Sequence, residues 1–212
     1  MEQTVWIARH GNRVDFLDPA WEKTAWWPND PGLAPDGIVQ ARQLAARLKG
    51  EPIQHIFSSP FLRTLETASY AAEVLRLPVK IEAGLSEWMN PRWYGKGPVL
   101  LPAEERDLFF PCLDKGYTSC VMPAYPETEA EMEARVARTV EELLARHSGD
   151  MLLFGHGASV SAAVYALTGL GEEVETPLCC LLKLVRTGDG WRLENNGDMS
   201  HLSDPDRTVR WV

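Results

Sequence analysis

Short apolar runs alternate with longer amphipathic stretches along most of this chain. The runs that predict strands lie at residues 5–8, 53–57, 79–81 and 151–154. Apolar residues at helical spacing predict helices at residues 35–49, 59–76, 128–147 and 159–167, with a shorter helical patch at 103–110. Two further segments, 179–185 and 191–194, flank Thr187-Gly188-Asp189-Gly190 and predict a β-hairpin. Because strands alternate with helices, the pattern predicts an α/β fold: a three-layer αβα sandwich with a mainly parallel sheet and an antiparallel edge.

Residues at the ends of the predicted helices agree with this pattern. Pro35 suits the first position of its helix, and Gly50 suits the point where that helix ends. Ser59 and Pro60 predict an N-cap and a first turn for the next helix. Thr128-Glu129-Ala130-Glu131 is a capping-box pattern, so the long helix is predicted to begin there.

Two stretches without a regular period interrupt the alternation. Residues 12–32 contain several prolines and the tryptophans Trp21, Trp26 and Trp27, which predicts an irregular excursion whose rings pack against the protein. Residues 88–126 are rich in glycine, proline and aromatic side chains. The sequence shows no repeat or long linker, so residues 1–212 are predicted to form a single domain with a small irregular cap from these two stretches.

The composition excludes several classes of partner. The chain has 212 residues and a formal net charge of −9, which disfavours nucleic acid or an anionic membrane as a main partner. No apolar run approaches the roughly 18–20 residues needed to cross a bilayer, and the first residues lack the pattern of an export signal. We therefore expect a cytoplasmic protein. Its four cysteines form no CxxC pair, so they are predicted to be reduced and to bind no zinc.

Chemically active side chains follow three of the predicted parallel strands. They are Arg9-His10-Gly11 after the first strand, Ser58 and Arg63 after the second, and His156-Gly157 after the strand at 151–154. Ligands of open parallel sheets bind beyond the carboxyl ends of the strands, so these side chains are predicted to share one site. Arg13 lies one short step from His10, which makes this a strongly cationic site in an acidic protein.

Phosphate is the ligand that fits such a site best. A guanidinium group is a planar fork that meets two phosphate oxygens at once, and a glycine such as Gly157 lets the backbone come close to a ligand. A neutral imidazole such as that of His10 is a competent nucleophile toward phosphorus, and it needs no metal where guanidinium groups spread the transferred charge. The sequence shows no carboxylate cluster with the spacing of Mg²⁺ or Zn²⁺ ligands, so no metal or other cofactor is predicted.

Phosphoryl transfer from an ester also needs an acid that protonates the leaving oxygen. Glu87, just past the short strand at 79–81, is the leading candidate, with Glu82 and Asp15 as competitors. Ser58 keeps two interpretations, a phosphate contact or the N-cap of the following helix.

The order of these motifs resembles the histidine phosphatase superfamily, which includes the cofactor-dependent phosphoglycerate mutases. The resemblance covers, in order, Arg9-His10-Gly11, residues 33–41, Ser58 to Thr64 with Thr67-Ala68, Leu85-Ser86-Glu87, and Gly155-His156-Gly157. It implies an αβα fold, a phosphorylated nucleophile at His10, and contacts to the phosphate oxygens from Arg9, Arg63 and His156. It also implies that Glu87 protonates the leaving oxygen and then activates the water that cleaves phosphohistidine.

Within the superfamily, the sequence resembles most the phosphatase domains of the suppressor-of-T-cell-receptor-signalling and ecdysteroid-phosphate phosphatase type. Those proteins carry an Arg at the position of Arg13 as an added phosphate ligand, and Glu87-Trp88 also matches them. The resemblance therefore implies substrate contacts from Arg13 and Trp88. Asn12 departs from the pattern, since those relatives carry an acid or Gln there, and it changes the surroundings of His10.

The predicted activity is that of a histidine acid-type phosphatase, a phosphoric monoester hydrolase. The substrate would be a small-molecule or phosphopeptide phosphomonoester, and inorganic phosphate would be released. Aromatic residues within 88–126 predict a roomy pocket for a bulky or aromatic leaving group. Two alternatives stay open: a cofactor-dependent phosphoglycerate mutase, and a non-catalytic module that binds phosphorylated ligands.

Overall fold

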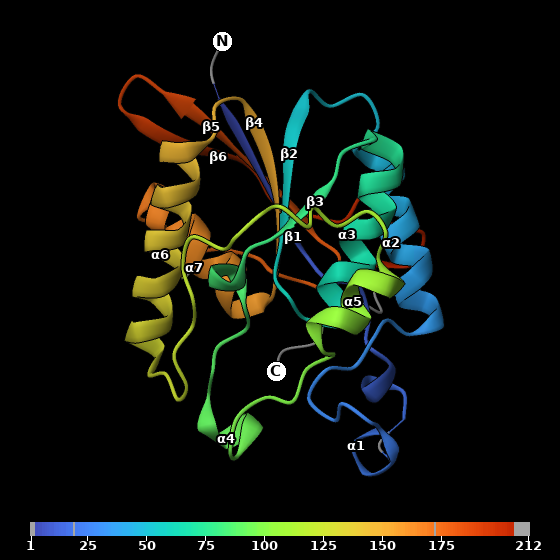
Figure 1. Ribbon diagram of the computed structural model, residues 1–212. Coiled ribbons are helices and arrows are strands. Elements are labelled where there is room, and N and C mark those ends of the chain that lie inside the picture. Colours follow the sequence, from blue (N-terminus) through green and yellow to red (C-terminus); the bar gives the residue numbers. More distant parts are fainter. Residues whose placement is uncertain (1–2, 19, 172, 206–212) are drawn as a thin grey trace.

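The computed structural model describes residues 3–18, 20–171 and 173–205, and a six-stranded mixed sheet lies at its centre (Figure 1). The strands are β1 (Thr4–Arg9), β2 (Ile53–Ser58), β3 (Val79–Ile81), β4 (Asp150–Gly155), β5 (Leu181–Thr187) and β6 (Gly190–Asp198), in the spatial order β3-β2-β4-β1-β5-β6. Strands β1 to β4 are parallel, whereas β5 and β6 form an antiparallel hairpin that joins the sheet along β1. The prediction of a mainly parallel sheet with an antiparallel edge is confirmed.

Helices cover both faces of this sheet. The longer helices are α2 (Pro35–Arg47), α3 (Leu62–Leu75), α6 (Glu129–Arg146) and α7 (Gly157–Thr168), and the shorter ones are α1 (Trp21–Thr24), α4 (Pro91–Tyr94) and α5 (Ala103–Phe109). Figure 1 shows α2, α3 and α5 on one side of the sheet and α6 and α7 on the other. This arrangement confirms the three-layer αβα sandwich.

Alternating side chains of the central strands supply a core on each face of the sheet. Trp6 and Ala8 of β1 join the cluster under α2 and α3, which also contains Leu44. Val5 and Ile7 of the same strand join the cluster under α6 and α7. Every residue of β1 is buried, as expected for a strand that has neighbours on both sides and helices on both faces. The rigid strands of this core carry the side chains of the site at their carboxyl ends.

The helix boundaries follow the local sequence signals with one exception. Pro35 lies in the first turn of α2, and Thr128 and Glu131 form the reciprocal capping box of α6. The helix predicted to begin at Ser59 begins at Leu62 instead. That prediction is wrong: the N-cap residue is Phe61, whose backbone is extended, and the Ser59 hydroxyl contacts both the Phe61 N–H and the His156 ring, which is distant in the sequence.

The two irregular stretches contribute to the cap only in part. Helices α1 and α4 lie beyond the carboxyl edge of the parallel strands, below the sheet in Figure 1. Leu101, Phe110 and Leu113, by contrast, are buried in the core cluster under α2 and α3, and Leu113 pairs with Val79 of β3. Residues 101–113, which were predicted as cap, therefore belong to the main body of the protein.

The tryptophans of the first irregular stretch have three different surroundings. Trp27 packs against the core cluster, as predicted. Trp26 is 89% exposed, so the prediction that it packs is wrong, and Trp21 lines a cavity at the sheet edge. Adjacent residues of an irregular loop point in different directions, so aromatic content alone does not determine which ring is buried.

The four cysteines are free, and Cys179 and Cys180 are buried. Within the described ranges, no helix combines the length and the apolar character that a membrane span requires.

Candidate active site

Three strand ends bring the predicted chemical residues to one edge of the sheet. Arg9 of β1 pairs with Gly155 of β4, and β2 ends at the same level on the other side of β4. His10 and His156 follow these strands directly, and the centroids of their rings lie 5.4 Å apart. Arg63 follows β2 in the first turn of α3. The parallel sheet thus unites motifs that are far apart in the sequence.

The His10 imidazole is buried and neutral. It is 1% exposed, and its Nδ1 lies 2.8 Å from the Gly11 carbonyl oxygen. Nδ1–H therefore donates to that carbonyl, which leaves the lone pair on Nε2. Burial lowers the pKa of His10 well below its ordinary value, and the cations Arg63, Arg9 and Arg13 lower it further. An uncharged ring with its lone pair on Nε2 is the form of histidine that acts as a nucleophile.

The His156 ring is the second buried imidazole of the site. Its Nε2 lies 2.8 Å from the Ser59 hydroxyl oxygen, and its Nδ1 lies 3.5 Å from a carboxylate oxygen of Glu87. Burial lowers the pKa of His156 well below its ordinary value, followed by the charge of Arg63 and the nearby His10 ring. Because the ring is neutral, its contact with Glu87 is not an ion pair. Nδ1 has no hydrogen-bond partner in the part of the chain that the structure describes.

The Arg63 guanidinium is buried with unused donors. The residue is 1% exposed, and its Nε and Nη1 have no hydrogen-bond partner among the described residues. Its Nη2 lies 3.7 Å from the Glu87 carboxylate, and the guanidinium lies over the Phe61 ring, 4.6 Å from the ring centroid. Burial lowers the pKa of Arg63, yet an arginine keeps its charge in proteins. A buried cation with unpaired N–H groups is unfavourable unless an anion binds beside it.

Arg9 supplies the second buried guanidinium of the site. Its Nη1 donates to the Thr176 carbonyl at 2.6 Å, and burial is the main cause that lowers its pKa. Gly157, at the start of α7, lies against this group: a Cβ there would be 3.4 Å from Cζ of Arg9. The absence of a side chain at Gly157 leaves room for the arginine beside the helix.

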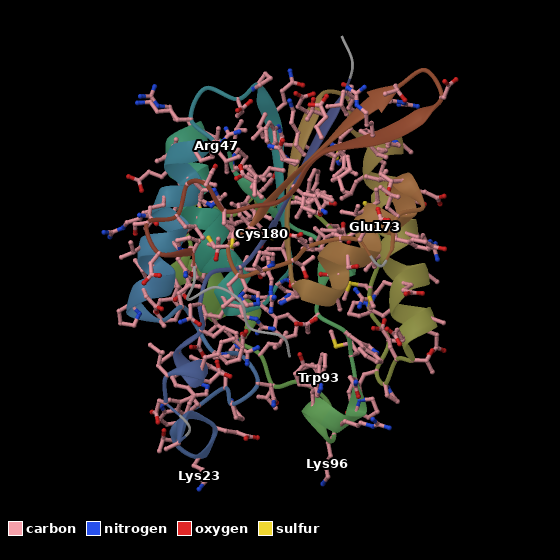
Figure 2. All side chains as sticks on the ribbon, turned by 180° about the vertical axis from the view of Figure 1, so that it is seen from behind. Lys23, Arg47, Trp93, Lys96, Glu173 and Cys180 are labelled. Carbon is pink, nitrogen blue, oxygen red and sulfur yellow. The ribbon has the colours of Figure 1, made fainter. Side chains whose placement is uncertain are left out.

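Glu87 borders two cavities at the sheet edge. One, of about 240 Å³, is also lined by Arg13, Arg63, Trp93 and Tyr94. The other, of about 260 Å³, is also lined by Arg9, Trp88, Trp93 and Gly157. Trp93 borders both cavities, and Figure 2 shows its side chain directed from α4 toward the body of the protein. Glu87 and Trp93 therefore border both cavities.

The competing carboxylates have other partners. Glu82 is fully buried and accepts hydrogen bonds from four groups of the surrounding protein. Asp15 forms an ion pair with Arg13. Of the three candidates, Glu87 is the one that lies between a site imidazole and a site guanidinium.

The polar groups of Arg13 and Ser58 already have partners within the protein. Arg13 lines the first cavity, but it pairs with Asp15 and lies over the Phe16 ring, 4.3 Å from the ring centroid. Ser58 is fully buried, and its hydroxyl donates to the Ser59 carbonyl. The interpretation of Ser58 as a helix N-cap is therefore wrong, because that helix begins several residues later.

The structure adds residues that the motifs did not single out. Ser59 contacts the His156 ring, Thr176 accepts a hydrogen bond from a site arginine, and Tyr94 lines the first cavity. Burial raises the pKa of Tyr94 to about 12, so its hydroxyl keeps its proton. Ser59 lies within the motif at 58–64, which was a usable signal, whereas nothing in the sequence marks Thr176.

Asn12 ties the loop after His10 to helix α2. Its backbone N–H donates to Gln40 at 2.8 Å, and its side-chain amide donates to Asp36 at 2.7 Å. The helix comes so close that a Cβ at Gly37 would lie 2.1 Å from the Asn12 carbonyl oxygen. The amide that departs from the superfamily pattern is thus paired with a carboxylate on α2.

Within residues 3–18, 20–171 and 173–205, no three or more His, Cys, Asp or Glu side chains are grouped so that they could hold a metal ion.

A carboxyl group outside the site gives the protein a testable pH dependence. Glu66 of α3 accepts a hydrogen bond from the Leu33 backbone N–H, and burial raises its pKa from the ordinary 4.5 to about 7. Between these values the folded protein binds a proton that the unfolded chain has lost. The free energy of unfolding therefore falls as the pH rises through this window, by at most about 3 kcal/mol.

Glu66→Gln is expected to remove this loss of stability. The measurement is urea unfolding of the wild type and the variant at about pH 5, where most of this stabilisation is still present, and at about pH 8, where it is lost. Glu73→Gln, at an exposed position of the same helix, is the matched control and should keep the wild-type pH dependence. Equal pH dependence in all three proteins would contradict the raised pKa of Glu66.

The fold and site define a class of protein: an αβα sandwich that places buried imidazoles and guanidinium groups at the ends of adjacent parallel strands. A sequence profile of the histidine phosphatase superfamily (branch 1) matches residues 5–198. The chain belongs to this superfamily.

Similarity to individual proteins agrees with this membership. The chain is 33% identical to the transcription factor tau 55 kDa subunit of Saccharomyces cerevisiae, over 85% of this chain and 46% of that protein. It is 27% identical to the ecdysteroid-phosphate phosphatase of Drosophila melanogaster, over 89% of this chain and 31% of that protein. The chain thus spans less than half the length of these relatives.

A solved structure of a related enzyme shows the same fold. The ecdysone phosphate phosphatase of Bombyx mori, in complex with tungstate, superposes with a TM-score of 0.69 at 24% identity and covers 92% of this chain and 93% of that one. At this identity the likeness establishes the fold, while the activity of the present chain has to be argued from its own side chains.

Proposed function

We propose that this protein is a metal-independent phosphomonoester hydrolase of the histidine acid type that works through a phosphohistidine on His10. The observation that carries the proposal is the buried His10 ring, whose Nδ1 donates to the Gly11 carbonyl and whose pKa is lowered by burial and by the charges of Arg63, Arg9 and Arg13. Such a ring attacks phosphorus without first losing a proton. The ecdysteroid-phosphate phosphatase among the relatives supports hydrolysis of this kind.

In the first step, Nε2 of His10 attacks the phosphorus of a phosphomonoester in line with the departing oxygen. A P–N bond forms, the P–O bond to the organic group breaks, and the Glu87 carboxyl gives its proton to the departing oxygen. In the second step, water gives a proton to the Glu87 carboxylate and attacks the same phosphorus. The P–N bond breaks, inorganic phosphate leaves, and both side chains return to their starting protonation states.

The buried cations take the charge of the transferring group. During its transfer, the phosphoryl group spreads negative charge over its three outer oxygens. A guanidinium group can donate two parallel hydrogen bonds to such oxygens. Arg63 suits this role because its Nε and Nη1 are buried and unpaired among the described residues. Arg9 and the His156 ring complete the set, and Arg13 adds a contact from the first cavity. The protein itself supplies the positive charge that a metal would bring.

The cavities beside Glu87 support a bulky leaving group. The first cavity, of about 240 Å³, is lined by the aromatic rings of Trp21, Trp93 and Tyr94 together with charged residues. Trp88 and Gly157 line the second, of about 260 Å³. Aromatic walls bind flat or apolar organic groups better than they bind a small acid. We therefore propose a phosphomonoester of a bulky or aromatic alcohol, either a small molecule or a phosphopeptide.

Hydrolysis of p-nitrophenyl phosphate by the purified protein in EDTA tests the proposal. We expect equal amounts of nitrophenol and inorganic phosphate, at a rate that EDTA leaves unchanged because arginines stabilise the transferred charge. A phosphoglycerate mutase would instead release phosphate slowly and isomerise phosphoglycerate when a bisphosphate primer is added, and a binding module would release none. Activity that disappears in EDTA and returns with Mg²⁺ would overturn the metal-free mechanism.

A further inference from the structure

We propose that Arg135 of α6 is a positioning residue for Glu87, an inference that rests on the proposed function. Arg135 borders neither of the cavities beside Glu87, so it does not meet the substrate there. Its guanidinium instead holds the backbone of the loop that carries the Glu87 carboxylate.

All the donor groups of Arg135 are engaged in this contact. The side chain is 6% exposed and makes five hydrogen bonds, which is the number of N–H groups in a guanidinium. Two of them go to the Glu127 carboxylate, at 2.7 and 2.9 Å. The other three go to the backbone carbonyls of Gly84, Ser86 and Glu87, at 2.7, 3.1 and 3.3 Å. One planar group thus spans the whole segment that leads to the carboxylate.

Glu127 extends the contact beyond Glu87. Its carboxylate accepts a hydrogen bond from the Met89 N–H at 3.3 Å, and its backbone N–H donates to the Met89 carbonyl at 3.0 Å. Its own carbonyl accepts from Nε1 of Trp88 at 3.0 Å. Arg135 and Glu127, which we call the Arg135–Glu127 clamp, therefore hold the loop before, at and after Glu87.

The Glu87 carboxylate has weak anchors inside the site. Its contacts with Arg63 and His156 are 3.7 and 3.5 Å long, beyond the range of a good hydrogen bond. A hydrogen bond of 3.1 Å comes from the Trp88 N–H, which belongs to the same loop. The place of the carboxylate is therefore set by the loop, and the place of the loop is set by the clamp.

Close packing between α6 and the loop makes this reach possible. Thr139 lies one turn after Arg135, and a Cβ at Gly84 would lie 2.0 Å from its hydroxyl oxygen. The helix therefore approaches the backbone of the loop directly, within reach of a planar guanidinium that bonds several carbonyls at once. A lysine would keep the charge beside Glu127 but has no such fork, so Arg135→Lys is not a conservative change here.

Two substrates with different leaving groups distinguish a role of Arg135 in positioning the acid Glu87 from a role in supporting the fold. The p-nitrophenolate ion leaves without a proton, whereas the alkoxide of ethyl phosphate needs one. We expect Arg135→Met to lower kcat/KM for ethyl phosphate about 100-fold and for p-nitrophenyl phosphate by less than about tenfold. Arg135→Lys should show the same selectivity with smaller losses. Arg138→Met, at an exposed position of the same helix, should match the wild type with both substrates.

Glu87→Gln, measured beside these variants, separates failure of this inference from failure of the proposed function. Selective loss in Glu87→Gln together with equal loss on both substrates in Arg135→Met would overturn the inference alone, since misfolding lowers both rates by one factor. Equal losses in Glu87→Gln would overturn the role of Glu87 and the inference together. Thermal unfolding reports the folded fraction, and where Arg135→Met does not fold, the selectivity of Arg135→Lys decides.

Discussion

Replacing His10 by alanine is expected to lower kcat/KM for p-nitrophenyl phosphate by roughly 10⁴-fold or more, because the change removes the group that forms the covalent intermediate. The fold should survive, because the change removes a ring that lies beside three cations and whose Nδ1 donates to the carbonyl of the adjacent Gly11. The measurement is steady-state hydrolysis together with circular dichroism of the same preparation.

Trapping of the intermediate identifies the nucleophile directly. Wild-type protein quenched during turnover of a radiolabelled phosphomonoester should carry label that is stable in base and lost in acid, as expected for a P–N bond. His55→Ala is the matched control, since the His55 ring lies 5.0 Å from the His147 ring and borders neither cavity beside Glu87. Undiminished turnover in His10→Ala, or label that persists in it, would remove the basis of the proposed mechanism.

The central fold could be predicted because its signals are local. The run at 5–8 reports burial on both faces of β1, and the capping box at Thr128 reports the start of α6, without knowledge of any distant partner. Residues 101–113 carried a local signal for the short helix α5, predicted at 103–110, but none for the packing of this segment in the core. Leu101, Phe110 and Leu113 flank that helix, and isolated apolar residues outside a regular period do not reveal whether they are buried.

The sequence could predict those site residues that directly follow the ends of parallel strands. His10 and His156 meet because the ends of parallel strands share one edge of the sheet. The sequence could not reveal the donors that hold these groups. A local capping signal marks Ser59 but does not reveal that its hydroxyl contacts the His156 ring, and no motif marks Arg135 of α6. Each acts through a contact made by tertiary packing, and no spacing rule covers such a contact.

Arg63→Met is expected to have opposite effects on activity and stability. Its guanidinium is 1% exposed, and its Nε and Nη1 lack partners among the described residues, so the folded protein holds a charge that is poorly compensated. An apolar side chain of similar length removes that cost, and we expect the free energy of unfolding to rise by about 1–3 kcal/mol. The same change removes donors for the transferred phosphoryl group, so kcat/KM should fall about 10³-fold. Urea unfolding and steady-state kinetics measure the two effects.

The effect of inorganic phosphate on stability tests whether Arg63 binds the anion. A ligand that binds the folded state alone stabilises it, by about 3 kcal/mol at a hundredfold excess over its Kd. Wild-type protein should therefore gain stability on addition of phosphate, whereas Arg63→Met should gain little, because the unpaired N–H groups that receive the anion are gone. Arg76→Met, at the exposed end of the same helix, should respond to phosphate as the wild type does. A variant Arg63→Met that is less stable than the wild type and still stabilised by phosphate would show that this guanidinium supports the fold and does not bind the anion.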